Sequence, residues 1–566
     1  MKNTKKLLAF LMAFALITCV ACSQSTSTSE SPGSSKSTTA AQTKSSESSV
    51  AESSKEETKA AAEDGPLAPY PEMITITTAR DASSVNAFRP GDDWSHNHYY
   101  DNYRTQLNID VVNEYEISGG GGYDAKINVL IASGDLPDFF RVSPLQLAQL
   151  NAAGSVLDLA DVYRTYASDL LRAEMESVDT ILPSVTYDGK MIGVPQTSIV
   201  AQGMMWIRGD WREKVGIQPD EIKTLEGFMT LVKAFMTEDP DGNGEDDTFG
   251  LTGLLLAGAY GQNWVFNAFH AYPRIWYERD GKAVYGSVQP EVRDALVYLT
   301  QLYEEGVLDP NFAAMEALQV QDAFNAHKLG VYDDKQWGST VFGGIRATEP
   351  DATLEYYEYP SSDDSPALAQ TSLPVTGIYV VNKDCQYPEA VIKLANFYLE
   401  KTWNLKDADE MSYYVSEDYE GVYYHHRTSA AIIPAVPLEH YKVGLECAGY
   451  WDGTLALEDT TVYTQSCIAY CFDPNQWYMD VLFGKNGAIT RLTPDIMDNN
   501  RYVADMYNLV PTATMETKWT VLTDKEEEVF LRIVMGQDSI DAFDTFVEEW
   551  HALGGDDITQ EMNARF

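Results

Sequence analysis

MITITT at residues 73–78 opens the stretch of sequence that decides the fold. Its apolar and polar residues alternate, which is typical of a β-strand with one buried face. Residues 100–107 have a helix-like pattern, and NIDVV at 108–112 predicts a second strand. Apolar residues then recur at helical spacing over 123–131, and Gly134 follows the last turn, where a left-handed backbone costs little. Strands and helices therefore alternate from the start of this stretch.

The same alternation continues to the end of the chain. The clearest helix is predicted over 290–305 and closed by Gly306, and Pro388 opens another. Thr523 and Glu526 have the spacing of a capping box, which predicts a helix start. We therefore predict an α/β fold with mostly parallel sheets covered by helices. A chain of 566 residues exceeds what one hydrophobic core serves, so at least two lobes are expected.

The chain is strongly acidic, with 40 Lys and Arg against 85 Asp and Glu and a formal net charge of −45. Residues 1–64 contain seven lysines and seven acidic residues, so the excess lies on the remainder. An acidic body repels phosphate backbones and anionic lipids, which argues against nucleic-acid binding and docking through a basic patch. A neutral or cationic ligand is favoured, unless the charge serves only to keep an extracellular protein in solution.

Three lysines precede an apolar run at residues 7–17, which is too short to cross about 30 Å of hydrocarbon. This pattern predicts a cleaved secretory signal over 1–22. CVACS at 19–23 resembles the lipobox of bacterial lipoproteins, whose cysteine is diacylated and becomes the mature N-terminus. The resemblance implies lipidation of Cys22. The match departs from the lipobox at Cys19, where an aliphatic residue is usual. Two alternatives stay open. Cys19 could be the acceptor, with Leu16 at the aliphatic position but with Thr18 a poorer neighbour than Ala21, or the signal could be an ordinary one that leaves a free cysteine.

Residues 23–64 are rich in Ser, Thr, Ala, Lys and Glu and contain no aromatic residue. Such a segment cannot bury enough apolar area to offset its ordering entropy, so we predict a disordered tether. Its 42 residues would reach about 35 Å as a flexible chain. With no later segment apolar enough to cross a membrane, the sequence predicts an extracellular body held by a lipid anchor on the outer face of the cell membrane.

Four cysteines remain after the tether: Cys385, Cys447, Cys467 and Cys471. One or two disulfides could form in an oxidising exterior, but so few cysteines do not make a disulfide scaffold. Their spacing has no paired C-x-x-C pattern, so a zinc site is not expected.

Several segments, in this order and behind the lipobox, resemble the family 1 extracellular solute-binding proteins, in particular the large lipoprotein branch of Gram-positive ABC importers. They are YDAKINVLIASGDLPD at 123–138, YDGKMIGVP at 187–195, IRGDWREKVG at 207–216, DPDGNGEDDTFG at 239–250, LTQLYEEGVLDPNF at 299–312, VVNKDCQYPEAVIKL at 380–394 and FLRIVMGQDSIDAFDTFVEEWHALGGDDITQEMN at 530–563. The resemblance extends from residue 72 to the end.

The resemblance implies a type II periplasmic-binding-protein fold, in which two discontinuous α/β lobes surround a ligand cleft. We place lobe 1 at 66–197 with 376–445, and lobe 2 at 198–375 with 446–566. It further implies a monomer that captures a small-molecule solute, a sugar or oligosaccharide in most members, by hinge closure. The solute would pass to a membrane permease with its ATPase, without a catalytic residue. Capture of a peptide or lipopeptide is the alternative within binding proteins.

A short Asp- and Gly-rich loop has the spacing of an EF-hand calcium loop. The predicted ligands are Asp239, Asp241, Asn243, Glu245 through its backbone carbonyl, and Asp247. Hard oxygen donors at this spacing suit structural Ca²⁺ better than zinc or copper. The loop departs from an EF-hand at position 12, where Gly250 replaces the bidentate Glu, and from the calcium loops of relatives at Thr248. The alternative is a turn held by hydrogen bonds alone.

Aromatic residues are the best sequence clue to the ligand, because sugar rings stack on aromatic faces while their hydroxyls bind polar side chains. Loop tryptophans with polar neighbours are the candidates. The predicted ligand-binding residues are Trp94, Asp135, Trp206, Asn263, Trp264, Trp276 and Trp337. For each of them, packing in the core is the competing interpretation.

The chain is predicted not to be an enzyme. It lacks a G-x-S-x-G elbow, an H-E-x-x-H motif and a G-x-x-x-x-G-K-[ST] phosphate loop. Paired carboxylates are unavoidable among 85 acidic residues, so they do not identify a glycoside hydrolase. A surface glycoside hydrolase nevertheless stays as the alternative from another class, since it would also suit an acidic, aromatic-rich chain.

Overall fold

The computed structural model describes residues 65–565, except 84–87, 119–120, 246, 258 and 420–421. The predicted signal peptide, the tether and Cys22 lie outside the described residues and stay predictions. No helix in the described part of the chain combines the length and the apolar content needed to cross a membrane.

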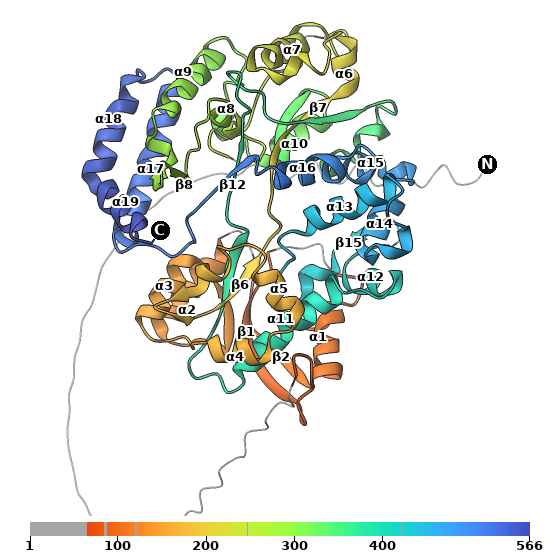
Figure 1. Ribbon diagram of the computed structural model, residues 1–566, viewed down its shortest axis with the longest axis vertical. Coiled ribbons are helices and arrows are strands. Elements are labelled where there is room, and N and C mark those ends of the chain that lie inside the picture. The colour runs from red at the N-terminus through yellow and green to blue at the C-terminus, as the bar shows by residue number, and fades with distance from the viewer. Residues whose placement is uncertain are drawn as a thin grey trace, which may run out of the picture. The chain divides into compact units, whose positions relative to one another are not determined.

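The first sheet has five strands in the order β2-β1-β3-β13-β6 (Figure 1). Their bounds are β1 Ile74–Asp81, β2 Ile109–Ile117, β3 Phe139–Val142, β6 Val194–Thr197 and β13 Val375–Val381. β1 pairs in parallel with β2 and β3, whereas β13 pairs antiparallel with β3 and β6. The expectation of mostly parallel sheets is therefore right for the first three strands and wrong for β13. Parallel neighbours are joined by a crossover connection, usually a helix, that packs on the same sheet. β13 has no such connection, because the chain enters it from the second sheet.

Helices pack on this sheet, as the alternating pattern predicts. α2 spans Gly122–Ser133 and ends at Gly134 with a φ of 75°, which confirms the predicted helix end. α11 spans Pro388–Thr402 and buries every residue from Ala390 to Leu399. The other helices here are α1 His98–Asn102, α3 Pro144–Ala152, α4 Ala160–Tyr166, α5 Asp169–Met175 and α12 Ala408–Tyr414.

The second sheet is antiparallel throughout, with the order β10-β7-β11, so the expectation of mostly parallel sheets is wrong here as well. β7 spans Gly203–Arg208, β10 spans Val331–Lys335 and β11 spans Leu354–Tyr357, and all six residues of β7 are buried. Since side chains alternate along a strand, β7 serves two cores. Met205 and Ile207 lie in one core and Met204 and Trp206 in the other.

Each face of β7 has its own layer of helices. One layer contains α6 Gly209–Lys214, α7 Leu225–Thr237, α8 Asn263–Ala268, α9 Glu291–Glu304, α17 Met515–Val534, α18 Asp541–Trp550 and α19 Asp556–Asn563. The other contains α10 Ala317–Asn325, α13 Glu439–Trp451, α14 Val462–Tyr470, α15 Trp477–Phe483 and α16 Thr493–Asp498. The first sheet has a separate core, built from residues up to Val194 and from 373–436. The predicted lobe boundaries themselves stay a prediction.

The predicted capping box at Thr523 and Glu526 is wrong. Both residues lie inside α17, which begins at Met515. The Thr523 hydroxyl donates to the Trp519 carbonyl at 3.1 Å, and Glu526 is fully buried, where it accepts a hydrogen bond from Tyr285. A capping box needs free N–H groups at a helix start, and α17 places this sequence two turns further on. None of the four cysteines Cys385, Cys447, Cys467 and Cys471 is joined in a disulfide in this structure.

Two buried carboxyl groups lie on β10. Asp333 and Asp334 are each 2% exposed, and they accept hydrogen bonds from the hydroxyls of Tyr359 and Tyr260, respectively, both at 2.6 Å. Tyr359 reaches Asp333 across Gly203, where a Cβ atom would collide with the tyrosine hydroxyl. Burial raises the pKa of Asp333 to about 8 and that of Asp334 to about 6.

We expect this pair to make stability depend on pH. Asp333 keeps its proton in the folded state at pH values where the unfolded chain has released it, so stability falls as pH rises toward about 8. Asp333→Asn removes this titration. The loss of unfolding free energy between pH 6.5 and 8.5 should then be smaller in the variant, by up to about 1.4 kcal/mol per pH unit.

Urea unfolding at several pH values measures this effect. Asp135→Asn, at an exposed position, is the control and should retain the slope of the wild type. Parallel pH profiles for wild type and Asp333→Asn would contradict the assignment.

Candidate functional site

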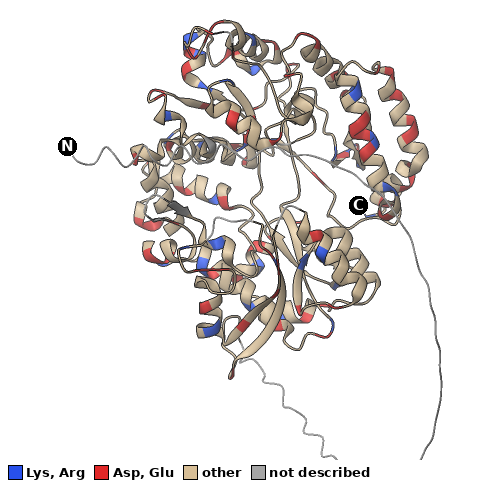
Figure 2. Ribbon diagram, turned by 180° about the vertical axis from the view of Figure 1, so that it is seen from behind, with Lys and Arg blue, Asp and Glu red and all other residues tan. Residues whose placement is uncertain are grey.

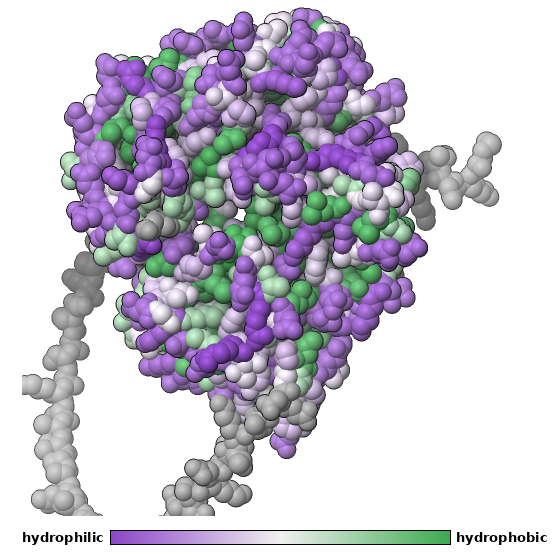
Figure 3. Space-filling view, viewed as in Figure 1, coloured by the Kyte–Doolittle hydropathy of each residue, from purple (hydrophilic) through white to green (hydrophobic). Residues whose placement is uncertain are grey.

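A cavity of about 910 Å³ is lined by residues from both halves of the fold. Its wall includes the passage from β6 to β7 at Ser198, the turn after β10 at Trp337, and the segment after β15 (Val422–Tyr424) at Arg427. α13, α14 and α15 complete it. Figure 3 shows apolar residues gathered across the middle of the face seen there, with hydrophilic residues around them. The cavity lies within the size range of small-molecule sites, about 300–1,000 Å³.

Aromatic and imidazole rings dominate the cavity wall. They are Trp337, His425, His440, Tyr463, Tyr470, Tyr478 and Phe483. Trp337 begins the 3₁₀ turn Gly338–Phe342, so the pairing of β10 with β7 fixes its position. Its ring meets the His440 ring edge to face, with centroids 5.6 Å apart, and His440 meets Phe483 in the same way at 6.3 Å. These contacts hold the rings in fixed orientations around the cavity.

The cavity has a low density of charge. Arg427 and Asp473 are the charged side chains among its described lining residues, and Arg427 lies 3.9 Å from the Glu439 carboxylate behind it. Burial lowers the pKa of His440 to about 3, and Arg427 adds to this effect. Burial likewise lowers the pKa of His425. Both imidazoles are therefore neutral near pH 7, in contrast to the acidic helices α17 and α18 on the outside (Figure 2).

Neutral hydrogen-bonding groups complete the wall, among them Thr340, Asn475 and Gln476. Such groups bind hydroxyls and amides. Asp473 is the one carboxylate among the described lining residues, whereas glycoside hydrolysis generally uses two. The neutral groups of this wall can bind hydroxyls and amides of a ligand.

Of the sequence-predicted ligand residues, Trp337 lines the cavity. Trp206 lies behind the wall, where it is fully buried and donates its Nε1–H to the Lys335 carbonyl at 3.0 Å. Gly338 approaches this ring so closely that a Cβ atom would lie 2.2 Å from Nε1. The prediction that Trp206 contacts ligand is therefore wrong in this structure, and its role is packing.

Asn263, Trp264 and Trp276 are also misassigned. Both tryptophans are 1% exposed and lie in the core that α8, α9 and α17 share, with Trp264 against Phe228. Asn263, 6% exposed, begins the same buried helix α8. A loop position in the sequence pattern suggested exposure, but β8 (Trp276–Arg279) and α8 are short elements packed inside the fold.

Trp94 and Asp135 do not line the cavity. The Trp94 ring is half-buried beneath the Arg80 guanidinium, 4.3 Å from the ring centroid. Arg80 donates to the carbonyls of Thr428 and Ala430, directly after Arg427. Trp94 thus supports the cavity wall from behind. Asp135 is exposed and accepts a hydrogen bond from Tyr115 at 3.3 Å. A ligand contact for either residue stays a prediction.

The sequence analysis missed His440 and the tyrosines of α14 and α15. A signal was present, since residues 440–483 are unusually rich in aromatic residues. Helical spacing, however, makes such residues look like core, and only the folded chain shows which ones turn toward the cavity.

The predicted calcium loop lies on the surface after α7. The Asn243 amide nitrogen donates to Asp241 Oδ2 at 2.8 Å and Asp247 Oδ1 at 3.1 Å, and Gly244 N donates to Asp239 Oδ2 at 3.1 Å. Burial and the neighbouring carboxylates of Asp239 and Asp247 raise the pKa of Asp241. No group of three His, Cys, Asp or Glu side chains in the described ranges is placed to hold a metal ion. The side chains of this loop do offer oxygen donors, which a hard cation prefers.

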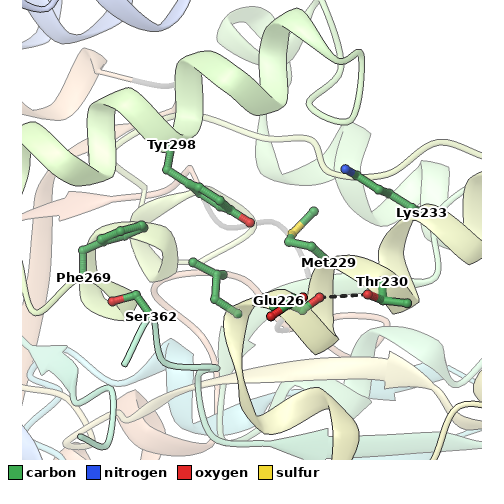
Figure 4. A pocket seen from close by; sticks show the side chains of 8 residues that line it. Glu226, Met229, Thr230, Lys233, Phe269, Tyr298 and Ser362 are labelled. Carbon is green, nitrogen blue, oxygen red and sulfur yellow. Dashed lines mark hydrogen bonds between the residues drawn. The ribbon is translucent and has the colours of Figure 1, made fainter. Parts of the chain in front are cut away.

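A second hollow, of about 430 Å³, lies between α7 and α9 (Figure 4). Tyr298 and Met229 point into it, and the Thr230 hydroxyl donates within α7 to the Glu226 carbonyl. Lys233 at its edge pairs with Glu305 at 2.7 Å. All its residues come from one half of the fold, so it lacks the two-sided wall of the larger cavity.

Residues 101–404, more than half of the chain, match the family of bacterial extracellular solute-binding proteins. The chain is 29% identical over 245 residues to lipoprotein LipO of Bacillus subtilis, covering 43% of this chain and 46% of LipO. It is 26% identical over 213 residues to the polygalacturonan/rhamnogalacturonan-binding protein YtcQ of the same organism, covering 37% of this chain and 41% of YtcQ. The matched part thus spans less than half the length of these curated relatives.

The fold is similar to that of an EF-hand mutant of the ABC-transporter substrate-binding protein FusA from Streptococcus pneumoniae, solved in complex with fructo-nystose. The TM-score is 0.57 at 15% identity, over 87% of this chain and 98% of FusA. This likeness bears out the predicted type II periplasmic-binding-protein fold. By the family match and this architecture, the chain belongs to the bacterial extracellular solute-binding proteins.

Proposed function

We propose that the protein captures a saccharide in the cavity around Trp337 and delivers it, chemically unchanged, to an ABC permease and its ATPase. The observation that carries this proposal is the cavity wall itself, in which aromatic rings alternate with neutral hydrogen-bonding groups. Sugar rings present C–H groups that stack on aromatic faces and hydroxyls that need in-plane polar partners. A peptide ligand would in addition need partners for its charged termini, and the described wall has few charges.

The relatives support this reading. YtcQ is a polygalacturonan/rhamnogalacturonan-binding protein, and FusA was solved with fructo-nystose. Both are saccharide binders, although their ligands differ in charge. The relatives also support a lipid-anchored place on the outer face of the membrane, since LipO is a lipoprotein.

Hinge closure is the mechanism that the fold supports. The cavity wall combines Ser198 and Arg427 with side chains of α13 to α15, so a ligand would touch both halves. Such a ligand binds the closed form more tightly than the open form and thereby shifts the population toward it. The importer would then recognise the closed form.

Trp337→Ala should weaken saccharide binding by about 10- to 100-fold, because one stacking face is lost (about 1.4–2.8 kcal/mol). A thermal-shift screen of oligosaccharides identifies a ligand, and calorimetry then measures its Kd in wild type and variant. Phe472→Ala, at an exposed ring that does not line the cavity, is the matched control. Equal affinities for wild type and Trp337→Ala would contradict the assignment of the binding site to this cavity. Cleavage of labelled oligosaccharides by the purified protein would favour the glycoside hydrolase alternative.

We also propose that the loop at 239–247 binds Ca²⁺ in a structural role. Its side chains offer oxygen donors, and a cation would relieve the mutual repulsion of the Asp239, Asp241 and Asp247 carboxylates. FusA, which shares the fold, has an EF-hand. None of the predicted loop ligands lines the cavity.

Removal of calcium should therefore lower stability and leave affinity nearly unchanged. Chelation is expected to reduce the melting temperature by several degrees, and Asp241→Asn should reduce or abolish this response. Differential scanning calorimetry with and without chelator measures the change, with Asp135→Asn as the control. An unchanged melting temperature on chelation would contradict calcium binding and favour the alternative, in which hydrogen bonds alone hold the turn.

A further inference from the structure

The cavity differs from the rest of the molecule in charge. The chain has a net charge of −45, yet the described cavity wall contains one cation, Arg427, and one carboxylate, Asp473. Asp473 accepts hydrogen bonds from the backbone and side-chain nitrogens of Asn475 at 2.9 and 3.1 Å. Arg427 has the Glu439 carboxylate 3.9 Å away. The two charges are separate and each has a protein partner.

A uronic-acid chain would bring one carboxylate on every ring. Each desolvated carboxylate needs a cation or several strong donors, and the surrounding acidic protein opposes its entry. One arginine with an acidic neighbour cannot serve several rings. A neutral oligosaccharide carries no such cost and can use the hydroxyl- and amide-bearing wall.

His440 supplies a second and independent observation. It is 6% exposed, lines the cavity, and its Nδ1 has no hydrogen-bond partner among the described residues. A buried polar atom without a partner is unfavourable, so a ligand that supplies one gains affinity. Trp337 and Phe483 fix the ring, and burial keeps it uncharged near pH 7. A neutral imidazole can exchange a hydrogen bond with a sugar hydroxyl but cannot neutralise a carboxylate.

We propose that the cavity selects uncharged oligosaccharides over uronic-acid-containing ones, and that His440 strengthens their binding through a hydrogen bond to a sugar hydroxyl. This inference rests on the proposed saccharide-binding function. It separates the chain from YtcQ, whose ligands include polygalacturonan.

The test uses probes matched in ring and linkage but not in charge. Trigalacturonate is compared with its fully methyl-esterified form, and a glucuronic-acid-substituted xylo-oligosaccharide with the methyl ester of the same compound. Neutral gluco-, manno-, galacto- and fructo-oligosaccharides complete the panel. Thermal shift of the purified protein identifies ligands, and calorimetry measures Kd. We expect at least one neutral member to bind, and each charged member to bind at least tenfold more weakly than its neutral match.

The outcomes distinguish this inference from the function on which it rests. A uronate that binds as tightly as its neutral match, or more tightly, overturns the inference and leaves saccharide capture standing. Failure of every glycan to bind overturns both.

Two substitutions test the role of His440. His440→Leu removes the hydrogen bond and should weaken neutral-oligosaccharide binding at least tenfold, whereas His440→Gln retains an uncharged hydrogen-bonding group and should restore most of the affinity. The melting temperatures of both variants without ligand show whether either substitution damages the fold. General damage would weaken binding in both variants, whereas loss of the hydrogen bond alone would weaken it in His440→Leu only. Wild-type affinity in both variants, or equal loss in both, overturns the assignment to His440.

Discussion

The antiparallel pairing of β7 with β10 is the constraint on which the rest of this structure depends. β7 has no exposed residue, and its alternate side chains face two separate helical layers. Its register with β10 sets Asp333 opposite Met205 and Asp334 opposite Met204. The same register pairs Lys335 with Gly203, the first residue of β7. Trp337, which follows β10, therefore lies near the segment that connects β6 of the first sheet to β7. A one-residue slip would exchange the two cores and turn the buried carboxyls to the wrong faces.

The two buried carboxyls and the cavity follow from one physical rule. Groups removed from water lose charge unless a partner compensates it. Asp333 and Asp334 are held by tyrosine hydroxyls, and His440 is held neutral between aromatic rings. The result is a largely neutral cavity within a protein whose surface is strongly acidic.

The errors in the sequence-based site have a common cause. Trp264 and Trp276 have polar neighbours in sequence, which suggested loops near a ligand, and Trp206 was a candidate because it lies near a predicted lobe crossing. In the fold, all three are core residues, because short strands and helices bury them from directions that local sequence does not encode. Trp337 lines the cavity, as the prediction of a ligand contact requires, but it is accompanied by rings from α13, α14 and α15, more than 100 residues later. The oxygen spacing of the loop at 239–247 was visible in the sequence, since a metal loop is a local feature.

Local periodicity by itself determined the alternation of strands and helices, the helix end at Gly134 and the start of α11 at Pro388. These features depend on residues within one or two turns of each other, and a sequence records such neighbours directly. Only the tertiary structure decided that β13 enters its sheet antiparallel, that Glu526 lies inside a long helix, and that His440 faces Trp337. These depend on contacts between segments far apart in the chain, where burial and charge arise from the whole fold and not from any single segment.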